Sequence, residues 1–373
     1  MTDTPSENIL PTDDADDRSL FTIEDLAVSF DIGQPERVQA VDGLSLTIHP
    51  RQTLALVGES GCGKSVTALS TLQLIPSPPG YIDRGSIALD GRNLLLCSPR
   101  EMLKVRGREI AMIFQEPMTS LNPVFTVGDQ IIETIRRHRH VSRAEARELA
   151  IETMQDVGLP DAHTALRTYP HEYSGGMRQR AMIAMALVCQ PRVLLADEPT
   201  TALDVTIQKQ ILRLLRELQQ ERGMAILLIT HDLGVVSEAA DVACVMYAGR
   251  AVEYASVTDL FERPMHPYTR GLLNSIPRLG ERRRRLRTVS ELVRNPEEFT
   301  RLPTANLGVE PWWPRRDEPD GVVPDEQGHR SVLHEIEPGH WVNCWRTPYV
   351  AAHLSGRPDL KVRRSTGATS ATS

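Results

Sequence analysis

One glycine-rich stretch constrains this chain more than any other. Residues Gly58-Glu-Ser-Gly-Cys-Gly-Lys-Ser65 fit the pattern G-x-x-x-x-G-K-[S/T]. The apolar run Thr53–Val57 precedes it, and Val66–Leu74 follows with apolar residues at helical spacing. A glycine loop between a strand and a helix presents backbone N–H groups and the positive end of the helix dipole to an anion. The stretch therefore predicts a site for the phosphates of a nucleotide.

Two side chains of this loop have predicted tasks of their own. We expect Lys64 to reach the β- and γ-phosphates and the Ser65 hydroxyl to ligate Mg²⁺. The alternative is a glycine-rich turn with an ordinary lysine, but a chance match to the motif is about a 1% event in this length. The residues predicted to contact the nucleotide here are Gly58, Glu59, Ser60, Gly61, Cys62, Gly63, Lys64, Ser65 and Val66.

Length and composition leave room for one large domain or two medium ones. The chain has 373 residues, of which 40% are hydrophobic and 24% charged, as in ordinary soluble proteins. Its net charge of −7 gives no support to nucleic-acid binding, which a basic surplus usually accompanies. No run of eighteen apolar residues occurs. The five cysteines are far apart, so we expect reduced thiols in a cytosolic compartment.

Three apolar strands end in polar residues that suit a nucleotide site. Gln115 follows Ile110–Phe114, Asp197 and Glu198 follow Val193–Ala196, and His231 follows Ala225–Thr230. Because strands alternate with helices, we predict an α/β fold with a largely parallel sheet whose strand ends gather these side chains at one edge. Asp197 suits a Mg²⁺ ligand, and Glu198 suits a group that polarises the water attacking the γ-phosphate.

A block of helices interrupts this sheet between about residues 116 and 190. Near its end, a helix opens with Tyr173-Ser-Gly-Gly-Met177. Free N–H groups at such a helix start offer a second anion site, whereas the simpler interpretation makes Ser174 an N-cap. β-Structure is expected ahead of the phosphate loop, from Phe21–Phe30 onward. Phe30 is either a core aromatic or a platform for the nucleotide base, and the pattern leaves both open.

The two ends of the chain differ from this core. Residues 1–20 are acidic and predicted to be disordered, while residues 21–277 hold the motifs. Residues 278–360 are predicted to form an irregular extension with some β-like patterning at Ser331–Trp345, and residues 361–373 a disordered tail. The basic run Arg282–Arg285 is interpreted as a solvated linker, with contact to anionic lipid head groups as the alternative.

The complete set of motifs resembles the ATP-binding subunits of ABC transporters over residues 21 to about 260. The resemblance implies a P-loop NTPase core with an antiparallel β subdomain and an inserted helical subdomain. It makes Gly58–Ser65 the Walker A motif, Val193–Asp197 the Walker B motif and Tyr173–Met177 the signature motif. The single residues it assigns are Gln115 as the Q-loop, Glu198 as the catalytic glutamate, His231 as the switch histidine, Asp204 in the D-loop and Phe30 against adenine.

The same resemblance implies a mechanism. Two ATPase subunits of this family enclose two ATP molecules, each P-loop facing the other subunit's signature motif. Ser174, Gly175 and Gly176 would then contact the γ-phosphate of the partner's nucleotide. By the same resemblance, Gln115 and Ser65 would join Asp197 in holding Mg²⁺, and His231 would clamp the γ-phosphate. The implied activity is ATP hydrolysis coupled to solute translocation, with ATP and Mg²⁺ as cofactors.

Finer motifs resemble the oligopeptide/dipeptide importers, namely Phe114–Pro123, Pro199–Thr206 and Arg263–Arg270. The form Ser-Gly-Gly-Met-Arg is similar to that of their D-type subunit. This implies a heterodimer with an F-type ATPase, two membrane permease subunits and an extracytoplasmic solute-binding protein, with no nucleic acid. It also implies a peripheral protein at the cytoplasmic face of the cell membrane. Relatives often carry a cysteine cluster in the extension, but only Cys344 remains here, so no iron–sulfur cluster is expected.

The cargo stays open at this point. Importers of this subfamily also move oligosaccharides, nickel and other small solutes, and the import direction itself rests on the resemblance. A soluble, non-transport ABC ATPase of translation or DNA repair is the alternative from another class. Such proteins usually carry two cassettes or long coiled coils, which this sequence lacks. A small-molecule P-loop kinase does not account for Ser174–Gly176 or His231.

Overall fold

The computed structural model describes residues 19–115, 120–201, 203–275, 289, 295–299, 309–314, 321–326, 328–353 and 357–362. Three predictions therefore lie outside the described residues. They concern most of the acidic tail 1–20, the basic run Arg282–Arg285 and nearly all of the tail 361–373.

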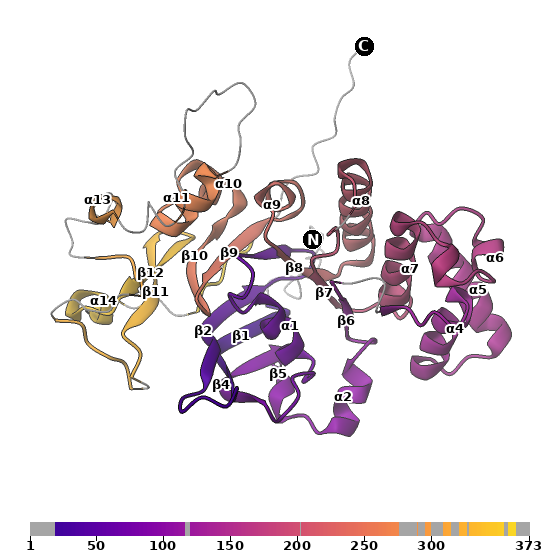
Figure 1. The fold of residues 1–373 in the computed structure, drawn as a ribbon, viewed down its shortest axis with the longest axis horizontal. Helices are drawn as coiled ribbons and strands as arrows, with labels where there is room; N and C mark the ends of the chain where they lie inside the picture. Colours follow the sequence, from indigo (N-terminus) through magenta and orange to yellow (C-terminus); the bar gives the residue numbers. More distant parts are fainter. Residues whose placement is uncertain are drawn as a thin grey trace, which may run out of the picture.

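An eight-stranded sheet forms the centre of the molecule, in the order β11-β12-β10-β9-β3-β8-β7-β6 (Figure 1). Its parallel strands are β3 (Thr53–Val57), β6 (Ile110–Ile113), β7 (Val193–Asp197), β8 (Ala225–Thr230) and β9 (Val242–Tyr247). Every residue of β3, β7 and β8 is buried, as in parallel sheets covered on both faces. The predicted largely parallel sheet is confirmed.

A second, antiparallel sheet packs beside the first, in the order β2-β1-β4-β5. Its strands are β1 (Phe21–Phe30), β2 (Val38–Ile48), β4 (Gly80–Leu89) and β5 (Arg92–Asn93). Phe21, Ile23 and Leu26 of β1 share one buried apolar core with Leu54 and Leu56 of β3. The antiparallel β subdomain implied by the resemblance is thus present, and its core is continuous with that of the strand leading into the phosphate loop.

Further helices belong to this part of the chain. They are α1 (Lys64–Thr71), α2 (Pro99–Val105), α8 (Val205–Arg222) and α9 (Leu233–Ala239). The sequence predicts that α1 runs to Leu74, but it ends at Thr71. Gln73 adopts a φ of +49°, and the Leu74 N–H donates to Leu69 O. A residue in the left-handed conformation thus ends the helix. The side-chain amide of Gln73 also donates to Leu94 O at 2.7 Å, so a tertiary contact fixes this early end of the helix.

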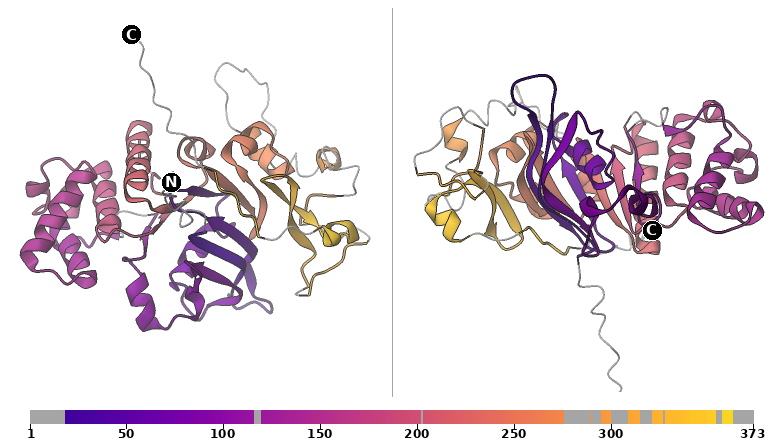
Figure 2. Two further views of the ribbon diagram at one scale, coloured as in Figure 1. Left: turned by 180° about the vertical axis from the view of Figure 1, so that it is seen from behind. Right: turned by 90° about the horizontal axis from the view of Figure 1, so that it is seen from below.

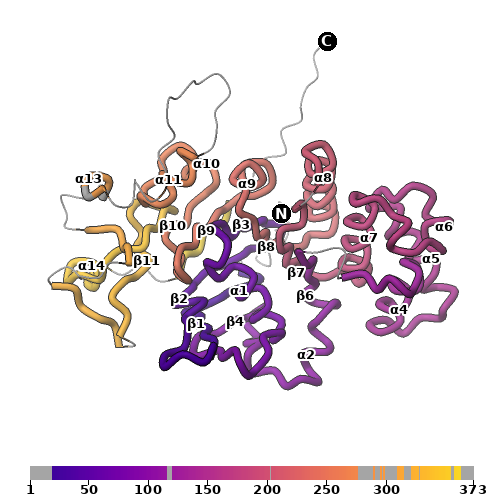
Figure 3. The backbone as a smooth tube through the Cα atoms, in the orientation of Figure 1, coloured from indigo at the N-terminus to yellow at the C-terminus, as the bar shows by residue number. Residues whose placement is uncertain are grey.

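The helical block forms a separate body beyond β6 (Figures 1 and 2). It holds α4 (Val127–His138), α5 (Arg143–Asp156), α6 (Ala162–Ala165) and α7 (Gly175–Leu187). Figure 3 shows the chain leaving β6 and returning to β7 through these helices. Inside the block, the buried Tyr173 hydroxyl donates to Ala165 O at 2.8 Å, which fixes the entry into α7. The inserted helical subdomain is confirmed.

The C-terminal extension is more regular than the sequence predicts. It contributes β11 (Ser331–Glu337) and β12 (His340–Trp345), which pair antiparallel with each other and, through β12, with β10 (Arg250–Ser256). Its helices, with those just before it, are α10 (Val257–Glu262), α11 (Pro267–Asn274), α13 (Pro296–Phe299) and α14 (Pro348–Ala352). Further along, the Gln52 amide donates to Leu360 O at 2.7 Å, so the chain returns to the core.

The helical subdomain and the C-terminal extension lie at opposite ends of the molecule in both orientations shown (Figure 2). The phosphate loop therefore sits between them, at the carboxyl end of β3. Among the described residues, no helix has both the length and the apolar character needed to cross a bilayer.

Candidate ATP-hydrolysis site

The loop after β3 turns tightly around the amino end of α1. At Gly63 the backbone has a φ of +103°, and a Cβ would lie 2.3 Å from Ala40 O of β2. At Gly58 a Cβ would lie 2.3 Å from Met246 O of β9. Side chains are excluded at both positions because neighbouring strands approach so closely. The two strands thus press the loop into one shape, with its N–H groups at the start of the helix.

Lys64 lies inside this loop and is only 5% exposed. Its Nζ donates to Gly58 O at 2.7 Å and to Glu59 O at 2.9 Å. A third contact, at 3.6 Å, reaches the Cys62 sulfur. Burial raises the pKa of the Cys62 thiol, and the Lys64 ammonium offsets this only in part, so the thiol stays protonated at neutral pH. The ammonium is the charge that the loop offers to a phosphate.

A cavity of about 180 Å³ opens in front of the loop. It brings together residues from the loop, from the end of β6 and from the end of β7, which lie far apart in the sequence. Most of the nucleotide-binding residues predicted in the phosphate loop line it. The lining residues are Ala40, Ser60, Gly61, Gly63, Lys64, Ser65, Val66, Gln115 and Glu198.

Asp197 closes the floor of the site at the end of β7. It is 4% exposed, the Ser65 hydroxyl bonds to it, and its Oδ1 is buried without a hydrogen-bond partner. Burial raises the pKa of Asp197, and the Ser65 hydrogen bond opposes that rise. A buried carboxylate oxygen left without a donor, next to a serine hydroxyl, is a pair of ligands that suits Mg²⁺. The residues present therefore fit the predicted ion.

Glu198, the next residue, is held at both carboxylate oxygens. Gln115 Nε2 and Thr201 Oγ1 each lie 2.9 Å from Oε2, and His231 Nδ1 lies 2.8 Å from Oε1. Burial alone would raise the pKa of Glu198, but the hydrogen bonds from His231, Thr201 and Gln115 outweigh it and lower the pKa. The group is thus an ionised carboxylate of fixed orientation on the cavity wall, as a base acting on water requires.

The backbone at Glu198 is strained. Its φ is +46°, a conformation that costs non-glycine residues about 1–3 kcal/mol. The Glu198 N–H donates to Ile229 O at 2.9 Å, so the neighbouring strand β8 holds the residue in place. This geometry turns the side chain from the sheet toward the phosphate loop.

The remaining predicted site residues do not line this cavity. Phe30 is half-buried and packs against Gly80, where a Cβ would lie 3.0 Å from its ring. Ser174 caps α7 by accepting from Met177 N at 3.3 Å, which confirms the N-cap interpretation, and it is exposed together with Gly175. Asp204 caps α8, accepting from Thr206 N and Ile207 N.

Ser174 and Asp204, with Gly176, lie at the amino ends of α7 and α8. Neither helix end lines the cavity in front of the phosphate loop. The binding roles of Phe30, Ser174, Gly175, Gly176 and Asp204 stay predictions.

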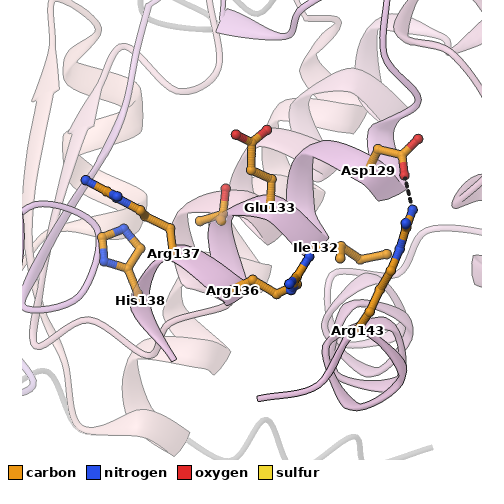
Figure 4. A pocket seen from close by; sticks show the side chains of 8 residues that line it. Asp129, Ile132, Glu133, Arg136, Arg137, His138 and Arg143 are labelled. Atoms are coloured by element: carbon orange, nitrogen blue, oxygen red, sulfur yellow. Dashed lines mark hydrogen bonds and ion pairs between the residues drawn. The ribbon is translucent and has the colours of Figure 1, made fainter. Parts of the chain in front are cut away.

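A larger hollow, of about 670 Å³, lies on the outer side of α4 and holds none of the predicted residues. Figure 4 shows it lined by charged side chains, with Arg143 of α5 bonded to Asp129 of α4 at 3.5 Å. Arg136, Arg137 and Arg143 make this region basic, and Glu133 and Asp129 partly balance it. This hollow is lined by exposed charged side chains, and no nucleophile or base among them is held in a fixed position. We therefore assign it no catalytic role.

Three residues near the site escaped prediction. Ala40 of β2 lines the cavity, Thr201 bonds to Glu198, and Tyr268 of α11 accepts a hydrogen bond from Glu59 N at 3.3 Å. Thr201 and Tyr268 lie within Pro199–Thr206 and Arg263–Arg270, which the sequence singles out as subfamily motifs without giving these two residues a role. The motifs were the available signal. Thr201 contacts a residue only three positions before it, whereas the partner of Tyr268 lies 209 residues away in the chain.

Comparison with known proteins supports this interpretation of the fold. The chain matches the family described as ABC transporter over residues 41–201, and the oligopeptide/dipeptide transporter, C-terminal region, over residues 252–302. The dimeric ATP-binding cassette MJ0796 bound to ADP and Pi is 25% identical with a TM-score of 0.57, covering 64% of this chain and 99% of that one. The fold and the site thus define an ABC transporter ATPase, which couples ATP hydrolysis to transport.

Relatives in sequence narrow this class further. A probable peptide ABC transporter ATP-binding protein of Sinorhizobium fredii, y4tR, is 50% identical over 88% of this chain and 95% of its own length. The dipeptide transport ATP-binding protein DppD of Bacillus subtilis is 44% identical over 90% and 98%. The oligopeptide transport ATP-binding protein AppD of Bacillus subtilis is 50% identical over 75% and 85%. This chain belongs to the oligopeptide/dipeptide family of ABC transporter ATP-binding proteins.

Proposed function

We propose that this chain energises the import of peptides, as one of two ATPase subunits of a membrane transporter. The observation that carries the proposal is the joint occurrence of a P-loop cavity, walled by a fixed Glu198, and a C-terminal region of the oligopeptide/dipeptide type. The relatives named for peptide transport match both parts of the chain together.

Hydrolysis would use the residues that the fold gathers around the cavity. Lys64 and the loop N–H groups bind the phosphates, and His231 holds Glu198 and contacts the γ-phosphate. Glu198 accepts the proton of the attacking water. Ser65, Asp197 and Gln115 would hold Mg²⁺, which supplies positive charge to the β- and γ-phosphate oxygens when it is bound.

A second ATPase subunit would complete the site. Ser174, Gly175 and Gly176 stand at an exposed helix start outside this chain's own cavity, so their N–H groups are available to a phosphate on another polypeptide. That the MJ0796 cassette was solved as a dimer with ADP and Pi supports this arrangement. We propose an F-type ATPase as the partner, which gives a heterodimer.

An apolar groove between the sheet and the helical subdomain would receive the membrane subunits. The groove has a volume of about 350 Å³, and its lining includes Leu74, Phe114, Met182 and Met185. Phe114 is 41% exposed, and Phe125 nearby in the chain is 53% exposed. Exposed apolar surface of this kind marks interaction sites. Docking there would place the protein at the cytoplasmic face of the membrane, with a solute-binding protein on the other side.

The decisive test is uptake by the assembled transporter. This chain, its partner ATPase and two permease subunits are reconstituted in vesicles with the solute-binding protein, and labelled di- and oligopeptides are offered. ATP-dependent peptide uptake that Glu198→Gln abolishes is the expected result. Uptake of oligosaccharides or nickel but not peptides would overturn the cargo. Purification as a soluble homodimer that binds no membrane protein would favour the non-transport ATPase.

A further inference from the structure

The phosphate loop has a direct contact with the C-terminal region that the catalytic scheme does not use. Glu59 N–H donates to the Tyr268 hydroxyl of α11 at 3.3 Å. The carbonyl of the same peptide unit, Gly58 O, accepts from Lys64 Nζ at 2.7 Å. One peptide plane is thus held at both ends, by a tyrosine on one side and by the phosphate-binding lysine on the other. Rotation of this plane would move the carbonyl that positions the ammonium.

Tyr268 itself is rigidly mounted. It is fully buried, and its ring packs against Tyr247 of β9 at 4.7 Å between centroids and against Trp313 at 6.3 Å. Trp313 in turn stacks on Tyr247 at 4.4 Å and 20°. Aromatic pairs at these separations attract one another beyond the area they bury. Burial raises the pKa of the Tyr268 phenol, so its hydroxyl remains neutral in the physiological range.

The start of α11 is fastened by a buried polar network. Glu253 of β10 is fully buried and accepts from Met265 N at 2.7 Å, from His266 N at 2.9 Å and from His340 Nε2 at 2.7 Å. Because buried charge must be satisfied to be tolerated, this network fixes the helix start to the sheet. Burial lowers the pKa of His266 to about 4, so its ring is neutral.

His266 joins this helix to the extension. Its Nδ1 accepts from Tyr268 N at 3.1 Å, which leaves the ring proton on Nε2, where it donates to Trp312 O at 2.9 Å. His266 therefore links the segment of Trp312 to the backbone of Tyr268. Trp312 N also donates to Asn343 O of β12 at 2.7 Å. A continuous chain of contacts runs from the added strand β12 to the phosphate loop.

We propose that Tyr268 is a positioning residue for ATP binding: its hydroxyl fixes the Gly58–Glu59 peptide, and the C-terminal extension holds the tyrosine in place. The inference rests on the assignment of the cavity as the ATP site. It gives the extension a role that requires no metal centre, namely to hold Tyr268 against the phosphate loop.

The test compares two buried tyrosines in the full-length chain. Tyr268→Phe removes the hydroxyl that meets Glu59. Tyr254→Phe removes an equally buried hydroxyl that donates to Thr47 O at 3.1 Å, away from the loop. Each change deletes one hydrogen bond to the backbone, so both should lower the melting temperature by a similar amount. Only Tyr268→Phe should raise the Kd for ATP, by about 2- to 10-fold.

The ATP Kd, compared with the Tyr254→Phe control, is the readout that a purely structural role would not move. Hydrogen exchange checks directly that the Tyr268 hydroxyl holds the Glu59 N–H. The segment containing Glu59 should exchange faster in Tyr268→Phe than in Tyr254→Phe. Equal ATP affinity and equal exchange in the two variants would overturn the positioning role. Lys64→Ala separates this result from a wrong site: if it also leaves the ATP affinity unchanged, the cavity assignment fails, whereas its loss of binding confines the failure to Tyr268.

Discussion

His231 and Glu198 are in direct contact at the wall of the phosphate cavity. His231 Nδ1 lies 2.8 Å from Glu198 Oε1, although 33 residues separate them in the chain. The histidine side chain is 56% exposed and the carboxylate only 10%. His231 therefore lies between Glu198 and the solvent, where a bound ligand can contact it. Gln115 and Thr201 hold the other carboxylate oxygen of Glu198.

This contact predicts a change in the pH profile of hydrolysis. The hydrogen bond from His231 helps to lower the pKa of Glu198, so the carboxylate is ionised above that lowered pKa and activity falls as the pH drops through it. His231→Ala removes the bond and raises the pKa. The acidic limb of kcat should then move to higher pH, together with an overall loss of turnover. Steady-state ATPase rates from pH 8 down to below the ordinary glutamate pKa of 4.5 check this, and an unmoved acidic limb would show that the histidine does not act on Glu198.

Thr201 offers a finer change at the same carboxylate. Thr201→Val keeps the shape of the side chain and removes the hydroxyl that lies 2.9 Å from Glu198 Oε2. One hydrogen bond to a charged group contributes about 1.5–3 kcal/mol, so kcat should fall by roughly tenfold or more while the Kd for ATP changes little. Thr206→Val, at the exposed start of α8, is the matched control. Equal effects of the two variants would argue against a role for Thr201.

The start of α7, which carries the signature motif, is the site of a third change. We expect its defect to appear only in the assembled pair of ATPase subunits. A Cβ at Gly175 would meet nothing closer than Leu203 Cδ2 at 3.8 Å, so Gly175→Ala fits this fold. The added methyl group would intrude where we expect the partner's γ-phosphate. The variant should bind ATP with wild-type affinity, but turnover at the partner's P-loop should fall at least tenfold. Unimpaired turnover by the pair would contradict the shared site.

The motifs and the strand ends could be predicted because the signals are local. A glycine pattern between a strand and a helix, and polar residues directly after apolar strands, require only neighbouring residues to be read. Since parallel strands end at one edge, Gln115 and Glu198 were expected near Lys64, and they line one cavity with it. The start of α2 depends on an equally local pattern, since Ser98 and Glu101 form a capping box with both of its bonds.

What escaped prediction depends on distant partners. The β-like pattern of residues 331–345 does not tell which strand it joins, so its pairing with β10 could not be foreseen. The early end of α1 depends on the bond from Gln73 to Leu94 O. Tyr268 acts through one hydrogen bond to Glu59, which lies 209 residues away in the chain. Phe30 stays open between core and base platform because it is half-buried against Gly80.

The central claim is that Glu198 is the base of an ATP-hydrolysing site at this phosphate loop. Glu198→Gln keeps the size of the side chain and removes the negative charge. ATP affinity and the rate of hydrolysis are measured on the same preparation of the assembled pair, with Lys64→Ala alongside. The account predicts that Glu198→Gln binds ATP normally and loses at least a hundredfold in turnover, while Lys64→Ala binds ATP weakly. Hydrolysis by Glu198→Gln at the wild-type rate would contradict it.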